Sequence, residues 1–599
     1  MPMIGRGRGI PTEKVDMKKN MGRIMASFRA YYLSLAVSLL CIAVSVVASI
    51  LAPQWLSKLT DTITEGAGTM SIDMPLVLHY GIVLCVFYGT NALMHFISSF
   101  IMNTAAHKYS KGLRSDVSQK INRMKLKYFD SHPHGDTLSI VTNDVDQIGM
   151  SLQQSVTSLF QSVLMLIGVL IAMFITSWQM ALAVLASVPF VLIVLMIVMK
   201  KAMPLFKRRQ NEIGEVNGIV EENFTGHIVI KAFNAEEAKK KVFDGANGRL
   251  YGTMVRAQAI AGIMQPLMSF ISYFAYAAVC LTGGLLLAGG KSGISFGTIS
   301  AFLVYINLFQ SPLSQIAQSM NTLQMAAASG SRVFDFLDEE EQSNESAKPR
   351  LLGSDNVKGT VEFRHVKFGY DESKTIIPDF SAKVSPGMKV AIVGPTGAGK
   401  TTIVNLLMRF YETNAGDILI DGVSSREMSR TELRSIFGMV LQDTWMFSGT
   451  LRENIVFNDS TISDERLDTI IKETNLDYYV STLSNGVDTV MEGENAMSAG
   501  QKQLVTIARA MAENAPLLIL DEATSNVDTR TEIEIQEAMD RLTKGRTSFV
   551  IAHRLSTIRN ADMILVMKNG NIIEQGNHEE LMAQNGFYAE LYNSQFALN

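Results

Sequence analysis

The chain has 599 residues, of which 47% are hydrophobic, with a mean hydropathy of +0.16 and a formal net charge of −4. This length exceeds what one hydrophobic core organises and indicates three or four structural units. The near-neutral charge, without a basic patch interleaved with aromatic residues, argues against a nucleic-acid partner. The excess of apolar residues lies in the first half, which predicts a membrane domain followed by a soluble domain.

The chain begins with a basic segment, residues 1–30, which we interpret as a cytoplasmic leader. It lacks a small-residue cleavage site next to a short apolar core, so we do not interpret it as a signal peptide. The three cysteines, Cys41, Cys85 and Cys280, fall within apolar stretches. We expect them to pack as small apolar residues rather than to form a disulfide or a metal site.

Six apolar stretches follow, each near the roughly 20 residues that cross a bilayer as a helix. They cover residues 31–51, 76–102, 156–176, 181–199, 259–288 and 297–318. Their length and their near absence of charge exclude the buried helices of a large soluble protein. The third and fourth stretches are so close in sequence that they must form a tight hairpin. We predict an all-α transmembrane domain of six helices over residues 31–336.

Lysine and arginine are concentrated in the leader and in two long loops, residues 103–155 and 200–258. The opposite loops carry little more than Lys58 and Lys291. The positive-inside rule therefore predicts that both termini and both long loops are cytoplasmic.

The two long loops combine apolar and charged residues at helical spacing, so we expect them to continue the membrane helices. Breaks at residues 129–135 and 224–227 would turn the chain back. Turns at these places would be able to contact the soluble domain, and solvated hairpins are the alternative.

The apolar stretches hold no acidic or basic residue at depth, which argues against an ion-coupled relay of carboxylates. Polar candidates for a cargo site are Asn91, His95, Asn307, Gln310 and Gln315. A further stripe of methionines and aromatics consists of Met264, Met268, Phe270, Tyr273, Phe274 and Tyr276. Such a stripe can line an adaptable apolar cavity, but ordinary helix packing is the favoured interpretation.

Residues 337–357 are acidic and polar, with Pro349 and Gly353, and are predicted to form a linker. From residue 358 to residue 599 the pattern alternates between strands and helices. This alternation predicts an α/β domain.

The pattern G-x-x-x-x-G-K-T occurs in this second domain, after an apolar strand at 390–393 and before a helix that begins near Thr402. Its residues are Gly394, Pro395, Thr396, Gly397, Ala398, Gly399, Lys400 and Thr401. In that context the glycines let backbone N–H groups surround a phosphate at the start of a helix. We predict a P-loop site for ATP that includes Thr402, in which Lys400 reaches the β- and γ-phosphates and Thr401 binds Mg²⁺.

An apolar strand over residues 515–520 ends in two carboxylates, Asp521 and Glu522. With a phosphate-binding loop in the same domain, Asp521 is predicted to hold Mg²⁺ through water. Glu522 is predicted to orient the attacking water. A plain junction between a strand and a turn is the alternative.

The segment Met497-Ser-Ala-Gly-Gln501 precedes a helical pattern, with Ser498 at the expected cap. Together with the phosphate loop and the two carboxylates, it resembles the nucleotide-binding domain of ATP-binding-cassette (ABC) transporters, whose signature is Leu-Ser-Gly-Gly-Gln. The resemblance implies that Ser498, Gly500 and Gln501 complete an ATP site on a partner domain.

The same resemblance implies further roles. Tyr370 matches the aromatic that stacks on adenine, and Gln442 matches the glutamine that senses Mg²⁺ and the membrane domain. Asp528 lies in the loop that crosses between two such domains, and His553 matches the histidine that contacts the γ-phosphate. The implied catalytic set is Glu522, His553, Lys400 and Gln442, and the implied metal-binding set is Thr401, Gln442 and Asp521.

The membrane half resembles the exporter branch of the family, the type IV fold, in which six helices are fused to one ATPase domain. Residues 127–130, 135–136 and 141–145 look like its first cytoplasmic loop, and 221–226 and 230–233 look like its second. The resemblance covers essentially the whole chain. It implies a dimer in which the fourth and fifth helices reach across to the partner subunit.

Two signature residues depart from the family pattern, because Met497 replaces leucine and Ala499 replaces the first glycine. Methionine conserves size, whereas a methyl at Ala499 is expected to crowd the phosphate or to strain a tight turn. An altered signature beside intact Glu522 and His553 resembles one subunit of the heterodimeric multidrug exporters. A homodimer that tolerates alanine is the alternative.

We therefore predict one half of an ATP-driven exporter of amphipathic or hydrophobic compounds, multidrug or lipid-like, in a bacterial plasma membrane. Its expected partners are a second half-transporter subunit, membrane lipids and a small amphipathic substrate, and its expected cofactors are ATP and Mg²⁺. The alternatives are a homodimeric exporter dedicated to lipid or peptide, and a regulatory subunit that gates a partner. These residues do not encode the direction of transport.

Overall fold

The computed structural model describes residues 16–186, 188–289, 293–353, 356–371, 374–442, 444–457, 459, 461–491, 497–521, 528–551 and 555–596. Contacts divide the chain into two compact units. The helical unit contains the chain up to Asn122 together with His134–Glu339. The α/β unit contains Arg123–Pro133 together with the chain from Glu340 onward. A short segment of the first half of the sequence therefore belongs to the second unit.

The helical unit is built from long helices joined by short turns. They are α1 (Met17–Ser27), α2 (Tyr32–Gly68), α3 (Met74–Arg123), α5 (His134–Ser139), α6 (Val145–Ser151), α7 (Thr157–Thr176), α8 (Trp178–Leu185), α9 (Val188–Thr225), α10 (His227–Ala232), α11 (Glu236–Ala288) and α12 (Phe296–Asp338). Phe28–Tyr31 forms a 3-10 turn, and two π-helical turns, Ile140–Asp144 and Leu152–Val156, connect α5, α6 and α7.

Five helical segments among the described residues are long and apolar enough to cross a membrane. They are Met17–Gly68, Met74–Arg123, His134–Thr176, Glu236–Ala288 and Phe296–Asp338. These segments contain five of the six predicted stretches. The remaining stretch, residues 181–199, falls on α8 and α9. Residue 187, between these two helices, is outside the described residues. The expected tight hairpin is confirmed, because Ser177 alone separates α7 from α8.

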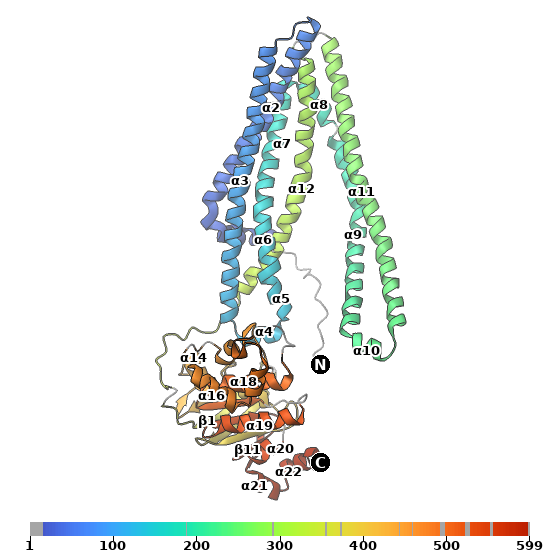
Figure 1. Cartoon of the computed structure of the whole chain (residues 1–599). Helices are drawn as coiled ribbons and strands as arrows, with labels where there is room; N and C mark the ends of the chain where they lie inside the picture. Colours follow the sequence, from blue (N-terminus) through green and yellow to red (C-terminus); the bar gives the residue numbers. More distant parts are fainter. Residues whose placement is uncertain are drawn as a thin grey trace. The chain divides into compact units, whose positions relative to one another are not determined.

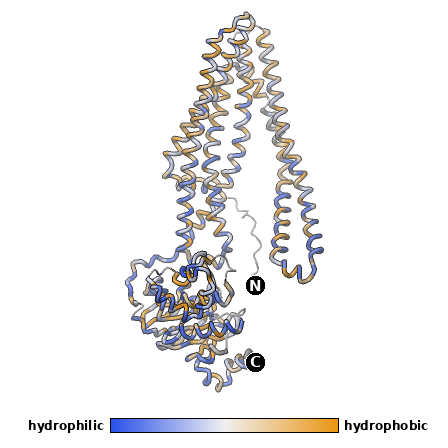
Figure 2. Tube along the Cα trace, in the orientation of Figure 1, coloured by the Kyte–Doolittle hydropathy of each residue, from blue (hydrophilic) through white to orange (hydrophobic). Residues whose placement is uncertain are grey.

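The membrane helices continue into the two long loops, as their helical spacing predicted. Helix α3 extends to Arg123, α9 extends to Thr225, and α11 begins at Glu236. Both predicted breaks are present, one between α4 (Leu126–Ser131) and α5 and the other at Gly226, between α9 and α10. Figure 2 shows hydrophobic residues along the upper parts of these helices and more hydrophilic residues toward their lower ends.

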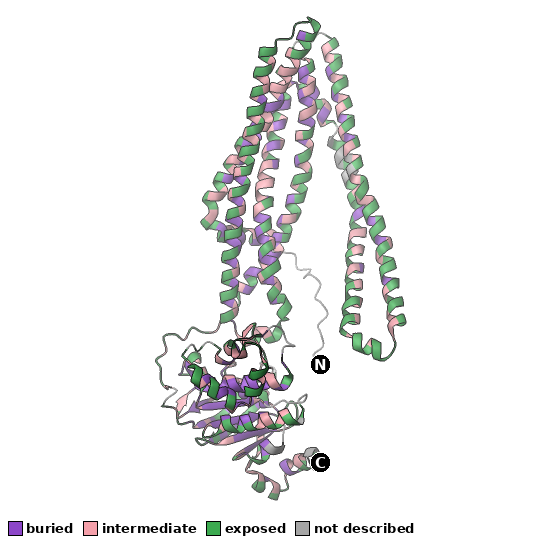
Figure 3. Cartoon of the chain, viewed as in Figure 1, coloured by how far each residue is buried: buried purple, intermediate pink, exposed green. Residues whose placement is uncertain are grey.

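The helices of this unit form a bundle and a separate arm. Helices α2, α3, α7 and α12 run side by side, whereas α9 and α11 pair with each other and diverge from the bundle (Figure 1). Val169, Phe302 and Tyr305 are among the residues that fill the bundle core. Leu33 and Ile175 are 79% and 77% exposed. Figure 3 shows exposed residues along the outer faces of the helices, as expected of helices that face lipid.

The α/β unit contains a parallel core sheet and an antiparallel sheet. The core sheet has the order β12 (Asn571–Gly576), β11 (Met563–Lys568), β3 (Lys389–Val393), β10 (Thr547–Ile551), β9 (Leu517–Asp521) and β6 (Phe437–Val440). Its strands from β11 to β6 are parallel, and β12 is antiparallel. The antiparallel sheet has the order β2 (Ile377–Val384), β1 (Val361–Phe368), β4 (Ala415–Ile420) and β5 (Val423–Ser424). A short ribbon pairs β7 (Gly449–Thr450) with β8 (Val490–Met491).

Helices cover the core sheet and enclose two main cores. Besides α4, they are α13 (Lys400–Leu407), α14 (Arg430–Ser435), α15 (Leu451–Val456), α16 (Asp464–Glu473), α17 (Asp477–Thr482), α18 (Ala499–Glu513), α19 (Thr529–Thr543), α20 (Leu555–Arg559), α21 (His578–Ala583) and α22 (Phe587–Phe596). The first core joins the two sheets and α13 around Phe380 and Phe549. The second lies among α15, α16, α18 and α19 and includes Leu467 and Val505. Every residue of β10 is buried, as expected of a parallel strand covered on both faces.

Candidate nucleotide-binding site

Neighbouring parallel strands end at one edge of the core sheet, and predicted site residues follow them. Strand β3 leads into the phosphate-binding loop, β9 ends at Asp521, and Gln442 follows β6 by two residues. Ile551 of β10 is in register with both Ile392 and Asp521, so these strand ends are level. Ligands of α/β domains bind outside the carboxyl ends of such strands. The fold therefore gathers residues that are far apart in the sequence at one edge.

The phosphate-binding loop, residues 394–399, has a backbone that depends on glycine. Gly397 and Gly399 have φ angles of 82° and 98°, in the left-handed region that other residues rarely adopt. A Cβ at Gly394 would lie 2.3 Å from the carbonyl oxygen of Met567. Left-handed residues that alternate with ordinary ones form an anion-binding concavity of backbone N–H groups. The loop thus has the conformation that binding of a phosphate requires.

Lys400 is the first residue of α13, and it is only 9% exposed. Its ammonium donates hydrogen bonds to the carbonyl oxygens of Gly394 at 2.7 Å and Pro395 at 3.2 Å. Burial lowers the pKa of Lys400, and the charge of Asp521 acts in the opposite direction. A buried cation within an anion-binding loop, with a carboxylate nearby, fits a nucleoside triphosphate and a divalent metal.

The other predicted nucleotide residues lie around the same helix. Thr401 is exposed in the first turn of α13, and Thr402 is buried. The Tyr370 hydroxyl lies 3.4 Å from Thr402 Oγ1. Asn405 Nδ2 of α13 donates a hydrogen bond to the same Tyr370 hydroxyl at 3.4 Å. Tyr370 is half-buried and packs edge-on to Phe368, with a centroid separation of 4.9 Å. The predicted adenine-stacking residue therefore lies beside the helix that carries the phosphate loop.

The remaining catalytic and metal candidates divide into described and undescribed residues. Gln442 is exposed, and Asp521 is half-buried at the end of β9. Glu522 and His553 lie outside the described residues, so their roles stay predictions. Asp528 is the N-cap of α19, where its carboxylate accepts a hydrogen bond from the Thr531 amide at 3.1 Å. That hydrogen bond lowers the pKa of Asp528.

The predicted signature lies in a different part of the α/β unit. Ser498 is the N-cap of α18: its hydroxyl accepts from the Gln501 amide at 3.2 Å, and Gln501 Oε1 accepts from the Ser498 amide at 3.0 Å. Gly500 is buried at the start of this helix. In the described part of the chain, no hydrogen bond or ion pair joins these residues to the phosphate-binding loop. The structure thus does not combine the signature with the phosphate loop of the same chain.

The two unusual signature residues have different surroundings. Met497 is 7% exposed and belongs to the second core, where it replaces a leucine of similar size. Ala499 is exposed, is the first residue of α18 and is not among the residues with positive φ. The prediction of backbone strain at Ala499 is therefore wrong, because a helical backbone accommodates a Cβ. The methyl of Ala499 is exposed at the N-terminus of α18, so the expectation that it crowds a phosphate stays a prediction.

Comparison with known proteins identifies the family. Residues 35–313 match the ABC transporter transmembrane region, and residues 377–525 match the ABC transporter family. A fatty acid ABC transporter ATP-binding/permease protein of Mycobacterium bovis is 44% identical over 528 residues, which cover 88% of this chain and 82% of that protein. The chain is an ABC transporter.

Two further comparisons specify the branch of ABC transporters. The probable multidrug resistance ABC transporter ATP-binding/permease protein YheH of Bacillus subtilis is 36% identical over 526 residues, which cover 86% of this chain and 76% of that protein. A solved structure of a bacterial Atm1-family ABC exporter with ATP bound has a TM-score of 0.73 at 25% identity, over 94% of this chain and 98% of that chain. This ABC transporter is therefore an exporter-type half-transporter with a type IV fold. It is a multi-pass membrane protein that couples ATP hydrolysis to transport.

In this exporter half, the first of the two turns, Arg123–Pro133, contacts the predicted linker of its own chain, at the start of the α/β unit. The Gln342 amide donates to the carbonyl oxygen of Arg123 at 2.8 Å, and its side chain donates to that of Met124 at 3.0 Å. Lys125 forms an ion pair with Glu340 at 2.6 Å. The expectation that a turn in this loop contacts the soluble domain is confirmed for this turn by the hydrogen bond that Asp130 accepts from Tyr411.

Tyr411, which was not predicted as a site residue, contacts both that turn and the candidate adenine-stacking residue. Its hydroxyl donates to the Asp130 carboxylate, and its ring packs edge-on to Tyr370 at 4.9 Å between centroids. Burial and the Asp130 charge raise the pKa of Tyr411, so the phenol stays protonated and able to donate. The partners are 281 residues apart, and no local pattern points to the pairing.

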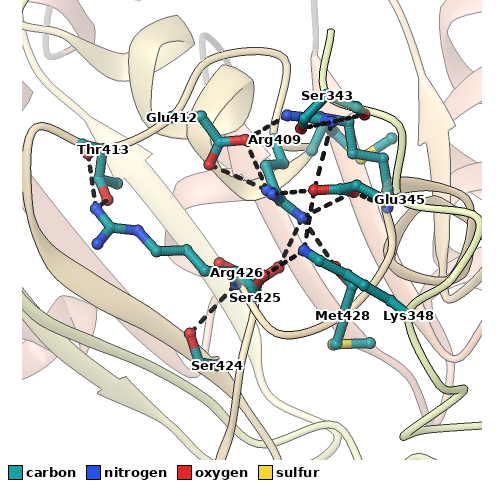
Figure 4. Close-up of polar contacts among 12 residues, drawn as sticks. Ser343, Glu345, Lys348, Arg409, Glu412, Thr413, Ser424, Ser425, Arg426 and Met428 are labelled. Atoms are coloured by element: carbon teal, nitrogen blue, oxygen red, sulfur yellow. Dashed lines mark hydrogen bonds and ion pairs between the residues drawn. The ribbon is translucent and has the colours of Figure 1, made fainter.

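A second missed cluster ties the predicted linker to the end of the P-loop helix α13. Arg409, which follows α13 with a φ of 51°, donates to Glu345 at 2.7 Å and to Glu412 at 2.9 Å (Figure 4). It also donates to the carbonyl oxygens of Ser425 and Met428 at 3.1 and 2.9 Å. Arg409 is buried and the side chain of Glu345 is 9% exposed, and several hydrogen bonds satisfy their charges, as an ion pair with little access to water requires. The only sequence signal was the acidic character of the linker.

Proposed function

We propose that this chain is one half of a dimeric exporter that uses ATP to move amphipathic or hydrophobic compounds across a bacterial plasma membrane, with both termini in the cytoplasm. The observation that carries the proposal is the sequence of contacts from α13 through Tyr370 and Tyr411 to Asp130. It gives a nucleotide site a direct mechanical connection to a cytoplasmic turn of the membrane helices.

The proposed division of labour follows the predicted domains: a leader (1–30), a transmembrane domain (31–336), a linker (337–357) and an ATPase domain (358–599). Residues 394–402 and Tyr370 would hold ATP. Lys400 is suited to neutralise charge on the β- and γ-phosphates, since it is a buried cation at the loop. Glu522 would orient the attacking water, and His553 would contact the γ-phosphate.

Thr401, Gln442 and Asp521 would hold Mg²⁺ at the edge of the core sheet. These residues offer a hydroxyl, an amide oxygen and a carboxylate, which are the hard oxygen ligands that Mg²⁺ prefers. When bound, Mg²⁺ would neutralise phosphate charge that develops during hydrolysis. The exposure of Gln442 and the electrostatic effect of Asp521 on Lys400 support this assignment.

A dimer is supported by apolar surface that one chain leaves uncovered. At the second cytoplasmic turn, Phe224, Ile228 and Phe233 are 87%, 83% and 78% exposed. On the ATPase domain, Trp445 and Phe447 are 62% and 48% exposed. Exposed apolar clusters of this kind mark interaction surfaces. We propose that the second turn docks on the ATPase domain of a partner subunit. The signature residues Ser498, Gly500 and Gln501 would complete the ATP site of that partner.

We favour a heterodimer over a homodimer. The exposed methyl of Ala499 stands at the N-terminus of α18, where a phosphate bound by the partner would approach. This chain retains Lys400 and Glu522 for its own ATP site. Such a combination suits a pair in which one composite site hydrolyses ATP and the other mainly binds it.

The decisive experiment is to purify the chain alone in nanodiscs and measure its ATPase activity and its mass. The proposal expects little activity until the product of a neighbouring gene is added. A stable, active dimer of this one chain would remove the heterodimer and show that the Ala499 signature is competent. A Lys400→Ala variant is the control, because activity that survives this change does not come from the P-loop.

A further inference from the structure

The helical bundle contains a cavity of about 650 Å³ among α2, α3, the π-helical turn Leu152–Val156, α7 and α12. Fourteen of the fifteen described residues that line it are polar, and Ile42 is the apolar member among them. The polar members comprise five glutamines, seven serines or threonines, Asn103 and His95. Ligand sites in proteins have volumes of about 300–1,000 Å³. This cavity is therefore large enough for a small headgroup.

The polar groups of the described lining residues are mainly amides and hydroxyls, and none of these residues carries a carboxylate, an ammonium or a guanidinium. His95 is the single titratable side chain among them. An anionic group would lack a counter-charge there, and a cationic group would lack both a carboxylate and an aromatic cage. The lining suits an uncharged group with many hydrogen-bond donors and acceptors.

Part of this hydrogen-bonding capacity is left unused by the protein. Asn103 Oδ1 is buried and has no partner. Gln315 is held in place, since it accepts from Ser162 at 3.1 Å and donates to Ser311 at 3.2 Å. Polar side chains within membrane helices are costly unless they are satisfied or serve a function. The unsatisfied oxygen and the fixed amide indicate a site built for a polar ligand.

The depth of the cavity indicates which part of a cargo it would meet. Its residues on α3 and α12 lie at the ends of the second and sixth apolar stretches, and those on α7 lie at the start of the third. With the proposed orientation, all three ends are on the cytoplasmic side. This is the level at which headgroups of the inner leaflet lie.

Helix α3 also carries an apolar stripe beside the cavity. Phe96 and Phe100 are 68% and 65% exposed and stack at 6.4 Å between centroids. His95 and Ser99, which line the cavity, have the same spacing of four residues along the helix. One helix thus presents a polar row and an aromatic row next to each other. An amphipathic molecule has this division between headgroup and chain.

We propose that the cavity binds the uncharged, multiply hydroxylated headgroup of a glycolipid-like cargo, while its hydrocarbon chains lie along the apolar helix faces. This inference rests on the proposed export function and specifies its substrate class. Gln161 of α7 and Gln318 of α12, on two different helices of the lining, are the residues assigned to the headgroup.

The test is native mass spectrometry of the assembled transporter with an equimolar mixture of three lipids that share dioleoyl chains. Their headgroups are glucosyl, phosphate and trimethylammonium. The unsubstituted protein should retain the glucosyl lipid about ten-fold over the other two, and Gln161→Leu with Gln318→Leu should remove this preference. Gln324→Leu, an exposed glutamine of α12 outside the lining, should retain it.

A charge substitution guards against misfolding as an explanation. Gln161→Lys should transfer the preference to the phosphate lipid, a gain that a damaged protein does not show. Equal retention of the three lipids, or a preference that Gln161→Lys leaves unchanged, would mean that the cavity holds only water and would overturn the inference. ATP hydrolysis is measured on the same samples. Hydrolysis without headgroup selectivity removes this inference alone, whereas no hydrolysis by the assembled transporter removes the proposed function.

Discussion

The turns in the two long loops of this exporter, Arg123–Pro133 and residues 224–233, have the same kind of sequence and opposite surroundings. Both interrupt long helices that extend from the membrane segments, and both carry aromatic and apolar residues. The first, Arg123–Pro133, is bound to the linker of its own chain through Gln342 and Lys125, and to the ATPase domain through Asp130. The second exposes Phe224 and Ile228 almost completely. The difference teaches that, among the described residues, the first turn has its partners within the α/β unit of its own chain, whereas the apolar side chains of the second turn are left exposed.

The largest effect is expected for Glu522→Gln, because Glu522 is the carboxylate proposed to orient the attacking water. Turnover should fall by about 10²–10³-fold, since the attacking water loses its orienting carboxylate, while ATP binding is kept. In hydrogen exchange with ATP, the second turn should become protected and stay protected, and the first turn should change little. Glu465→Gln, an exposed carboxylate on α16, is the control. Full turnover of Glu522→Gln would remove Glu522 from the catalytic role.

Negative charges introduced at the second turn should weaken its proposed docking contact. Phe224→Asp with Ile228→Asp should lower transport by about ten-fold or more, because an apolar anchor would become charged at an interface. Transport into proteoliposomes is the measurement. Val242→Asp, at a 57% exposed position on α11 of the same arm, should transport normally. Equal losses in both variants would argue against a docking role for the second turn.

A smaller effect is expected at the first turn from Tyr411→Phe. This change removes the hydrogen bond to Asp130 and keeps the packing on Tyr370. The amount of cargo moved per ATP should fall about three- to ten-fold, the equivalent of one hydrogen bond, with ATP binding little changed. Tyr478→Phe, at a 77% exposed tyrosine on α17, serves as the matched control. An unchanged ratio of cargo to ATP would show that this contact does not couple the two processes.

The smallest effect at neutral pH concerns Glu345, in the linker segment that holds the first turn. Burial alone would raise the pKa of Glu345, but hydrogen bonds from Lys348 and Arg409 outweigh burial and lower it from 4.5 to about 2. Because the folded state holds the carboxylate ionised, the stabilisation is complete above pH 4.5. It is lost as the pH falls from 4.5 toward 2, by roughly 3 kcal/mol in total.

Calorimetry of the ATPase-domain transition at a series of pH values measures this dependence. Glu345→Gln should flatten the acid limb of the curve and lower stability at neutral pH, since Arg409 would lose the less exposed of its two carboxylate partners, leaving only the exposed Glu412. Glu579→Gln, at an exposed position on α21, should leave the curve unchanged. An acid limb that is the same in all three proteins would assign it to other carboxylates.

Local patterns in the sequence determined much of this exporter. The glycine spacing of residues 394–399, the cap at Ser498 and the helical continuation of both long loops were predicted, and the structure has them. Each depends on residues a few positions apart, whose conformational limits act locally. The prediction of strain at Ala499 failed for a related reason, because the helix of which it is the first residue sets its backbone.

Only the tertiary structure decided which distant residues meet. The hydrogen bond of Tyr411 to Asp130 and the ion pair of Arg409 with Glu345 span 281 and 64 residues. The cavity is lined by four helices and a π-helical turn, so the amides of Gln161 and Gln318 come to line one cavity only when the bundle forms. Such contacts form because the packing of apolar faces fixes the register of neighbouring helices. No local sequence pattern specifies that register. The sequence itself therefore determined the ATP-binding motif, and the packed fold decided how that motif connects to the membrane.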